Sequence, residues 1–229
     1  MKSRLSLPVF AAIALVSTSA IAAGVAVVSG GAAGGDVVEG KGPSKIEERK
    51  AGVWSAILVE APVRMRYAVS STPSLKIIAQ ANILPLLTTE VSGRRLVIGL
   101  KKSIRTDVAI RVEASGPSPE SVVLSGTGDV KLTGISGRAL RLEIPGAGDM
   151  TASGQVSALS VEISGSGTVD AAGLRSQDAV IDLSGSGNVS AHASTSVRVG
   201  LSGSGDIMVT GSPRQRSVDR SGAGDVTFR

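Results

Sequence analysis

The stretch Val161-Glu-Ile-Ser-Gly-Ser-Gly-Thr-Val169 decides the fold, because close variants of it recur through the second half of the chain. Its centre is a small residue, Gly, a small residue, Gly, a polar residue and an aliphatic residue. Six copies start at intervals of 20, 19, 20, 18 and 19 residues, at Ser125, Pro145, Ser164, Ser184, Ser202 and Ser221. A period near 19 residues is typical of one coil of a parallel β-solenoid, in which each repeat contacts only its neighbours.

Alternate residues on both sides of each copy are aliphatic, which indicates strands with one face turned inward. Three places before each copy stand Val122, Leu142, Val161, Ile181, Val199 and Val218. The first aliphatic residue after the glycines is Val130, Met150, Val169, Val189, Ile207 or Val226. In the last copy, Arg216 and Arg220 replace two inward aliphatics. We expect these charges to oppose end-to-end strand pairing.

The paired glycines mark the corner between successive strands. They are Gly126, Gly128, Gly146, Gly148, Gly165, Gly167, Gly185, Gly187, Gly203, Gly205, Gly222 and Gly224. We expect glycine here for two reasons: a tight bend uses φ values that only glycine adopts cheaply, and stacked corners leave little room for a Cβ. The predicted fold class is thus all-β, a single-domain parallel β-helix-like solenoid.

The first half keeps the strand alternation but lacks the glycine motif. Residues 46–116 are predicted to form further, more degenerate coils of the same solenoid, ahead of the regular repeats in 117–229. Before them, residues 23–45 are rich in Gly and Ala and are predicted to be a flexible tether. The folded unit is therefore expected to begin near Ile46.

The N-terminus has the features of a secretory signal over residues 1–22. Lys2 and Arg4 precede an apolar stretch, and Ala20-Ile-Ala22 is a small-x-small cleavage site. An alternative is that 7–28 is retained as a membrane anchor. Either way the protein is expected to be exported, to the periplasm, the outer envelope or the extracellular space.

Composition excludes several classes of function. Among 229 residues there is no Cys, one His and only 2% aromatic residues, and the net charge is a mild +5. Disulfide frameworks, Cys/His zinc sites and base-stacking platforms are excluded, and no nucleic-acid partner is expected. The single His192 is predicted to be an exposed, inert corner residue. No cofactor and no catalytic residue is predicted.

The polar residue after each second glycine is the strongest candidate for chemistry. It is Asp129, Asp149, Thr168, Asn188, Asp206 or Asp225. The four aspartates are weak candidates for a cation or for an acid–base pair. Because Thr and Asn cannot act as acid or base, we favour a cap in which each side chain accepts backbone N–H groups of its own corner.

Two short basic clusters are predicted to be solvated surface or contacts for acidic glycans or anionic lipid. One consists of Lys101, Lys102 and Arg105, and the other of Arg214, Arg216 and Arg220.

Several segments of the first half, together with the start of the regular repeats, resemble the putative auto-transporter adhesin head GIN domain family. The resemblance rests on Asn82-Ile-Leu-Pro-Leu-Leu-Thr-Thr-Glu-Val91, Leu96-Val-Ile98, Asp107-Val-Ala-Ile-Arg-Val112 and Ser121-Val-Val-Leu-Ser-Gly-Thr-Gly-Asp129. It extends over about 46–229 and implies an exported bacterial β-helix-like domain, with no catalytic residues to carry over.

The function predicted from these observations is a non-enzymatic, adhesin-like binding or scaffold module of the cell envelope. Its partner would be an envelope or extracellular ligand, and an acidic glycan is the candidate. Self-association into a homo-oligomer is a further possibility. A carbohydrate-active β-helix enzyme is the alternative.

Overall fold

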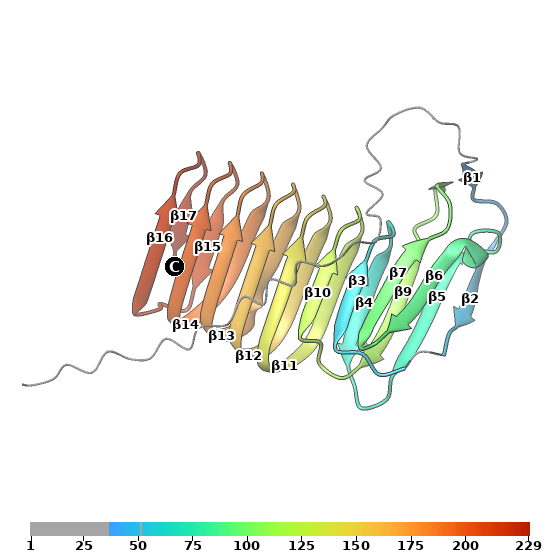
Figure 1. Cartoon of the computed structure of the whole chain (residues 1–229), viewed down its shortest axis with the longest axis horizontal. Helices are drawn as coiled ribbons and strands as arrows, with labels where there is room; N and C mark the ends of the chain where they lie inside the picture. The colour runs from blue at the N-terminus through green and yellow to red at the C-terminus, as the bar shows by residue number, and fades with distance from the viewer. Residues whose placement is uncertain (1–36, 51) are drawn as a thin grey trace, which may run out of the picture. The chain divides into compact units, whose positions relative to one another are not determined.

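Alternation of inward aliphatic and outward polar residues makes each repeat of the second half one long strand. In the computed structural model, which describes residues 37–50 and 52–229, these strands bend near their middle and pair in parallel register (Figure 1). They are β11 (Asp129–Ile144), β12 (Asp149–Ile163), β13 (Thr168–Leu183) and β14 (Asn188–Leu201). The predicted all-β parallel solenoid is confirmed.

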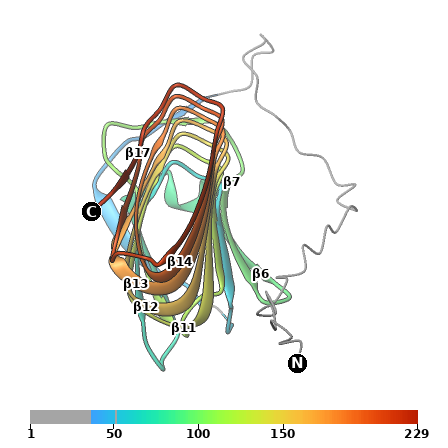
Figure 2. The ribbon, with the colours of Figure 1, turned by 90° about the vertical axis from the view of Figure 1, so that its left-hand side faces the viewer.

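The bend divides each coil between two faces of one continuous sheet that encloses the core, and we call them face A and face B (Figure 2). Face A holds the first part of each long strand and face B the second part. Toward the C-terminus, face A continues with β15 (Ile207–Thr210) and β17 (Val226–Phe228), and face B with β16 (Gln215–Arg220).

Toward the N-terminus both faces end in strands from the first half of the chain. Face A continues through β4 (Arg64–Val69), β9 (Arg111–Gly116), β5 (Ser74–Gln80) and β2 (Ser44–Glu48). Face B continues through β10 (Ser121–Leu124), β3 (Ala56–Val59), β7 (Arg95–Leu100) and β6 (Leu87–Ser92). Three short elements complete this end: β1 (Val38–Glu39), β8 (Ile104–Arg105) and the 3-10 turn η1 (Leu84–Leu86).

The prediction that 46–116 forms a run of degenerate coils is only half right. Strands β3, β4, β7 and β9 are parallel coil strands, but β2, β5 and β6 run antiparallel to their neighbours. The order is also not sequential, since the β3–β4 coil lies between the β7–β9 coil and the β10–β11 coil. The antiparallel strands cover both edges of this end, and covering an edge prevents it from pairing with another chain. We call the whole N-terminal end that these strands close, residues 38–50 and 52–116, the antiparallel cap.

The predicted inward columns are buried in one continuous core that extends from Trp54 to Val209, except in the last copy, where Val218 is exposed and Val226 is only partly buried. The column at the end of face B is fully enclosed through five coils, in Leu124, Ile144, Ile163, Leu183 and Leu201. Because β-strand neighbours lie about 4.8 Å apart, each of these side chains packs directly on the equivalent one in the next coil.

The corner glycines are required by close approach of one coil to the next. A Cβ built on Gly165 would lie 1.8 Å from the carbonyl oxygen of Gly146 in the preceding coil, far inside contact distance. Among the described corner glycines none has a φ in the left-handed region, so the expected reason of special φ values is wrong and the expected lack of space is correct. Positive φ occurs instead at the mid-strand bend, for example 136° at Gly154 and 93° at Gly211.

Two arginines close the C-terminal end of the core. The Arg216 guanidinium lies 4.5 Å from the centre of the Phe228 ring, so a face B side chain stacks on a face A ring. Arg220 donates to the Asp225 carboxylate at 3.1 Å. Both arginines occupy positions where earlier coils have aliphatic residues. Arg216 lies against the aromatic ring of β17, and Arg220 lies against the carboxylate at the corner before β17. We call this pair the arginine lid; its effect on end-to-end pairing stays a prediction.

The folded part begins earlier than the predicted boundary near Ile46. β1 lies at 38–39 and pairs with β8, and β2 begins at Ser44 and pairs along β5. The many Gly and Ala residues of 23–45 made strands difficult to predict there. An edge strand is held by backbone pairing and needs only a short apolar pattern. The signal-peptide and anchor predictions fall on residues outside those described. Within the described part, no helix is long and apolar enough to cross a membrane.

Candidate functional site

The corner column of polar residues is a set of hydrogen bonds between coils. The Asp149 carboxylate accepts the backbone N–H of Thr168 at 3.0 Å. In the following coils, Asn188 accepts the N–H of Asp206, and Asp206 accepts that of Asp225, each at 3.0 Å. The prediction that each side chain caps its own corner is therefore wrong in detail, because the acceptor reaches the equivalent residue of the next coil. Asp129 instead pairs with Arg64 at 3.3 Å.

Replacing Asp149 by Asn should leave the free energy of unfolding nearly unchanged. The Asn amide oxygen can accept the Thr168 N–H as Asn188 does one coil later, so the loss should stay below the roughly 0.5–2 kcal/mol typical of a lost side-chain cap. Urea midpoints of the two proteins measure this, with Asp149→Ala as the control that removes the acceptor. If Asp149→Asn unfolded the protein, the carboxylate would have a role beyond accepting the Thr168 N–H, and this prediction would be wrong.

A second polar column lies on the outside of face B. The register aligns Glu143, Glu162, Asp182, Gly200 and Asp219 across five neighbouring strands. Arg141 pairs with Glu143 at 3.3 Å and with Glu162 at 2.6 Å. This column was not predicted from the sequence, because the predicted site residues were those after the second glycine of each repeat. The signal was present in the position two places before each repeat.

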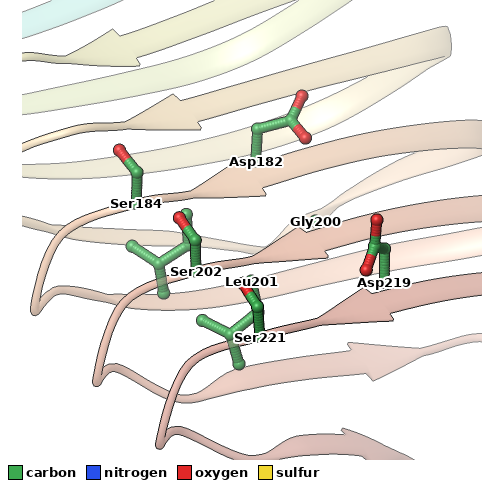
Figure 3. A pocket seen from close by; sticks show the side chains of 8 residues that line it. Asp182, Ser184, Gly200, Leu201, Ser202, Asp219 and Ser221 are labelled. Atoms are coloured by element: carbon green, nitrogen blue, oxygen red, sulfur yellow. The ribbon is translucent and has the colours of Figure 1, made fainter.

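Glycine interrupts this column and leaves a notch of about 180 Å³ in the outer surface. Figure 3 shows Asp182 and Asp219 on either side of the bare Gly200 position, with Ser184, Ser202 and Ser221 at the strand ends. The Asp182 carboxylate leans over the gap, since a Cβ on Gly200 would lie 2.6 Å from its Oδ1.

The electrostatics of the notch are those of crowded carboxylates. Partial burial, and then the negative charge of Glu162, raise the pKa of Asp182, while Arg198 and Arg141 act in the opposite direction. No group of three or more His, Cys, Asp or Glu in the described ranges is arranged to hold a metal ion. The notch therefore offers two carboxylates and three hydroxyls without a complete cation cage.

The remaining predicted candidates are dispersed. Lys101 and Lys102 are exposed in the turn after β7, with the exposed Arg105 close by in sequence. His192 is half-buried, contrary to the expected exposure. Its ring lies against the bend at Gly211 of the next coil, and its buried Nδ1 has no hydrogen-bond partner among the described residues.

The only tyrosine of the chain lies inside the antiparallel cap. Tyr67 is 1% exposed, and its hydroxyl donates to the carbonyl of Pro117 at 2.6 Å. Burial raises the pKa of Tyr67 to about 12. The phenol is therefore protonated wherever the cap is folded at ordinary pH.

Stability should fall as the pH rises from about 10 to about 12. The tyrosine ionises at lower pH in the unfolded state than in the folded state, so the unfolded state binds fewer protons in this range. The stability that is present below pH 10 is therefore lost as the pH rises through the pKa of the folded state. The expected loss is about 2–3 kcal/mol. Denaturant midpoints against pH measure the loss, with Tyr67→Phe as the control whose midpoint lacks this contribution. Because the chain has one tyrosine, tyrosinate absorption reports this site alone; ionisation of the folded protein near pH 10 would contradict the expectation.

The sequence matches one family model, described as "Putative auto-transporter adhesin, head GIN domain", over residues 54–213. The match starts at the buried Trp54 and includes all four long strands and the antiparallel cap from β3 onward, without β1 and β2. Among curated proteins, none matches the chain.

Solved structures share the fold at low sequence identity. A putative adhesin from Bacteroides fragilis is 19% identical with a TM-score of 0.71, and the match covers 84% of this chain and 100% of that one. A putative lipid binding protein from Parabacteroides distasonis is 18% identical with a TM-score of 0.57, over 85% and 100% of the two chains. A putative adhesin from Parabacteroides merdae is 17% identical with a TM-score of 0.55, over 85% and 99%.

Proposed function

The chain belongs to the family of putative auto-transporter adhesin head GIN domains, and from that premise we propose that it is an exported, non-enzymatic binding or scaffold module of the bacterial cell envelope. Its role would be adhesin-like, with a ligand in the envelope or outside the cell. The basic n-region and the Ala20-Ile-Ala22 cleavage site support export.

One observation carries the non-enzymatic part of the proposal. The repeated polar residues Asp149, Asn188 and Asp206 bind the backbone of the next coil. The column with the best spacing for acid–base chemistry thus has a structural use that Asn fulfils as well as Asp. A rod with such regular coils is suited to present its outer surfaces to a partner.

An acidic glycan is the ligand class that we propose first. Lys101, Lys102 and Arg105 are exposed together at the antiparallel cap, and none of them forms an ion pair with another described residue. Unpaired cations on a surface attract polyanions at moderate ionic strength. A Parabacteroides neighbour of the same fold is described as a lipid binding protein, so ligands other than glycans belong in the test.

Expression of the full chain in a Gram-negative host tests export and binding together. Mass spectrometry of the recovered product should show an N-terminus at Ala23 or Gly24. The product should be retained on alginate, polygalacturonate or heparin more strongly than on neutral dextran, with no release of reducing ends, and Lys101→Gln/Lys102→Gln should weaken retention. Release of reducing ends would establish the carbohydrate-active enzyme instead. An intact, membrane-bound N-terminus would establish the retained anchor.

A further inference from the structure

The antiparallel cap has a groove on its outer surface that the repeat pattern does not predict. Strand β6 diverges from the line of face B, as Figure 2 shows, and the β6–β7 hairpin borders a hollow of about 400 Å³ beside β3. Its lining residues combine two cations, aliphatics and hydroxyls: Ser55, Ala56, Leu58, Ser92, Arg94, Arg95 and Val97. A volume of this size is in the usual range for a small-molecule site.

The groove opens onto an outward row of aliphatic side chains, of which Val97 and Leu58 line the groove and Val123 lies beyond them. The register places Val97 beside Leu58 and Leu58 beside Val123, all on the solvent side of face B and all only half-buried. Farther along the same face, the equivalent positions are the carboxylates of the outer column, which begins at Glu143. Aliphatic side chains at outward positions of one end therefore form a localised apolar strip, and such strips mark interaction sites.

Two unpaired guanidinium groups stand at one side of this strip. Arg94 and Arg95 are exposed at the hairpin tip, and neither forms an ion pair or a side-chain hydrogen bond with another described residue. Arg95 has the small residues Ser92 and Ala56 as its two cross-strand neighbours, which leaves space around its side chain. Arginine forks bind phosphate and carboxylate oxygens in pairs.

We propose that this groove binds a single-chain lipid with a phosphate monoester head. The two guanidinium groups match a head that carries between one and two negative charges at neutral pH. The aliphatic tail would lie on Val97, Leu58 and Val123, where its burial removes apolar surface from water. This ligand and this groove are separate from the glycan-binding cluster proposed above.

The charge distribution of face B favours one lipid molecule over a membrane surface. The carboxylates Glu162, Asp182 and Asp219 lie on the same outward face as the groove. An anionic bilayer laid along this face would be repelled by them, whereas a single molecule at the hairpin contacts only the basic end. Two opposing charges lie near the groove: Glu90 pairs with Val97 across the hairpin, and the Glu60 carboxylate lies beside Gly99 of β7.

Isothermal titration calorimetry of the exported protein with dodecyl phosphate, kept below its micellar concentration, tests the proposal. We expect binding that inorganic phosphate and dodecyl maltoside do not reproduce. Arg94→Gln/Arg95→Gln should weaken binding at least tenfold and Leu58→Ser severalfold, whereas Glu90→Gln should strengthen it. Lys101→Gln/Lys102→Gln removes the same charge from another exposed site and should change the affinity less than twofold.

Each contrary result overturns a defined part of the proposal. Equal losses from the two double variants would show a net-charge effect without a site. Equal affinity for inorganic phosphate would show that the apolar floor is unused. Binding of phosphatidylglycerol vesicles without binding of monomeric dodecyl phosphate would show a membrane contact instead. Retention of the Arg94→Gln/Arg95→Gln protein on polysaccharides is measured in parallel. It shows whether the proposed glycan function holds independently of the result at the groove.

Discussion

Gly165→Val is expected to prevent stable folding of the solenoid. The new Cβ would lie 1.8 Å from the Gly146 carbonyl oxygen, which accepts the N–H of Ser166 at 3.1 Å. Neither group can move aside, because both are backbone and each is stacked on a further coil. The two coils must separate at the corner, and the hydrogen bonds on both sides of it are lost. We expect a loss of more than about 4 kcal/mol, which is exceptional for one substitution.

Gly173→Ala is the matched control for this prediction. Gly173 lies in the same coil at the mid-strand bend, and the nearest atom to an added Cβ is that of Ser153 at 3.5 Å, an ordinary contact. Its φ lies outside the left-handed region, so alanine should be neutral or stabilising by about 0.5–1 kcal/mol. Denaturant midpoints and far-ultraviolet circular dichroism compare the variants. A folded Gly165→Val protein would show that the coils are not stacked at this corner.

Ile163→Ala is the second change for which we expect a large effect. Ile163 is fully buried, and the register places Ile144 and Leu183 directly on either side of it. Because each coil is held at the strand spacing, the neighbours cannot collapse into the space that the side chain leaves. The expected loss is about 2–5 kcal/mol, from lost burial and from the remaining cavity.

Two further substitutions make this prediction specific to the inward column. Ile163→Val should cost only about 0.5–1.5 kcal/mol, because a single methylene is removed. Val218→Ala changes an aliphatic of the last coil that is 44% exposed, and it should be close to neutral. If Val218→Ala destabilised the protein more than Ile163→Ala did, the assignment of inward positions would be wrong.

The regular coils were predictable from the sequence because one physical requirement repeats at one period. Inward side chains such as Val161 and Leu183 must be apolar, and the corner must lack a Cβ, so both features recur about every 19 residues. The reason for the glycines was only partly predictable. Contact between a Cβ and the preceding coil is a property of the stack, and no single repeat contains it.

The antiparallel cap was not predictable because its strands alternate in the same way as coil strands. Residues of β5 and β9 show the same period of two, and nothing in that period specifies whether neighbours run parallel or antiparallel. The partner of the Asp149 carboxylate was hidden for a similar reason, since a residue 19 positions away is brought beside it only by coiling. The groove at Arg94 and Arg95 depends on the divergence of β6, which is a tertiary feature.

The two ends of the solenoid are closed by unrelated means, the antiparallel cap and the arginine lid, whereas the coils between them are interchangeable. A duplication or deletion of one whole repeat would leave both closures intact and would change the distance between them by about 4.8 Å. Descendants of one ancestral gene can therefore acquire rods of different reach in single recombination steps. The groove beside the hairpin would stay unaltered throughout, and its separation from the opposite end would be set by repeat number alone.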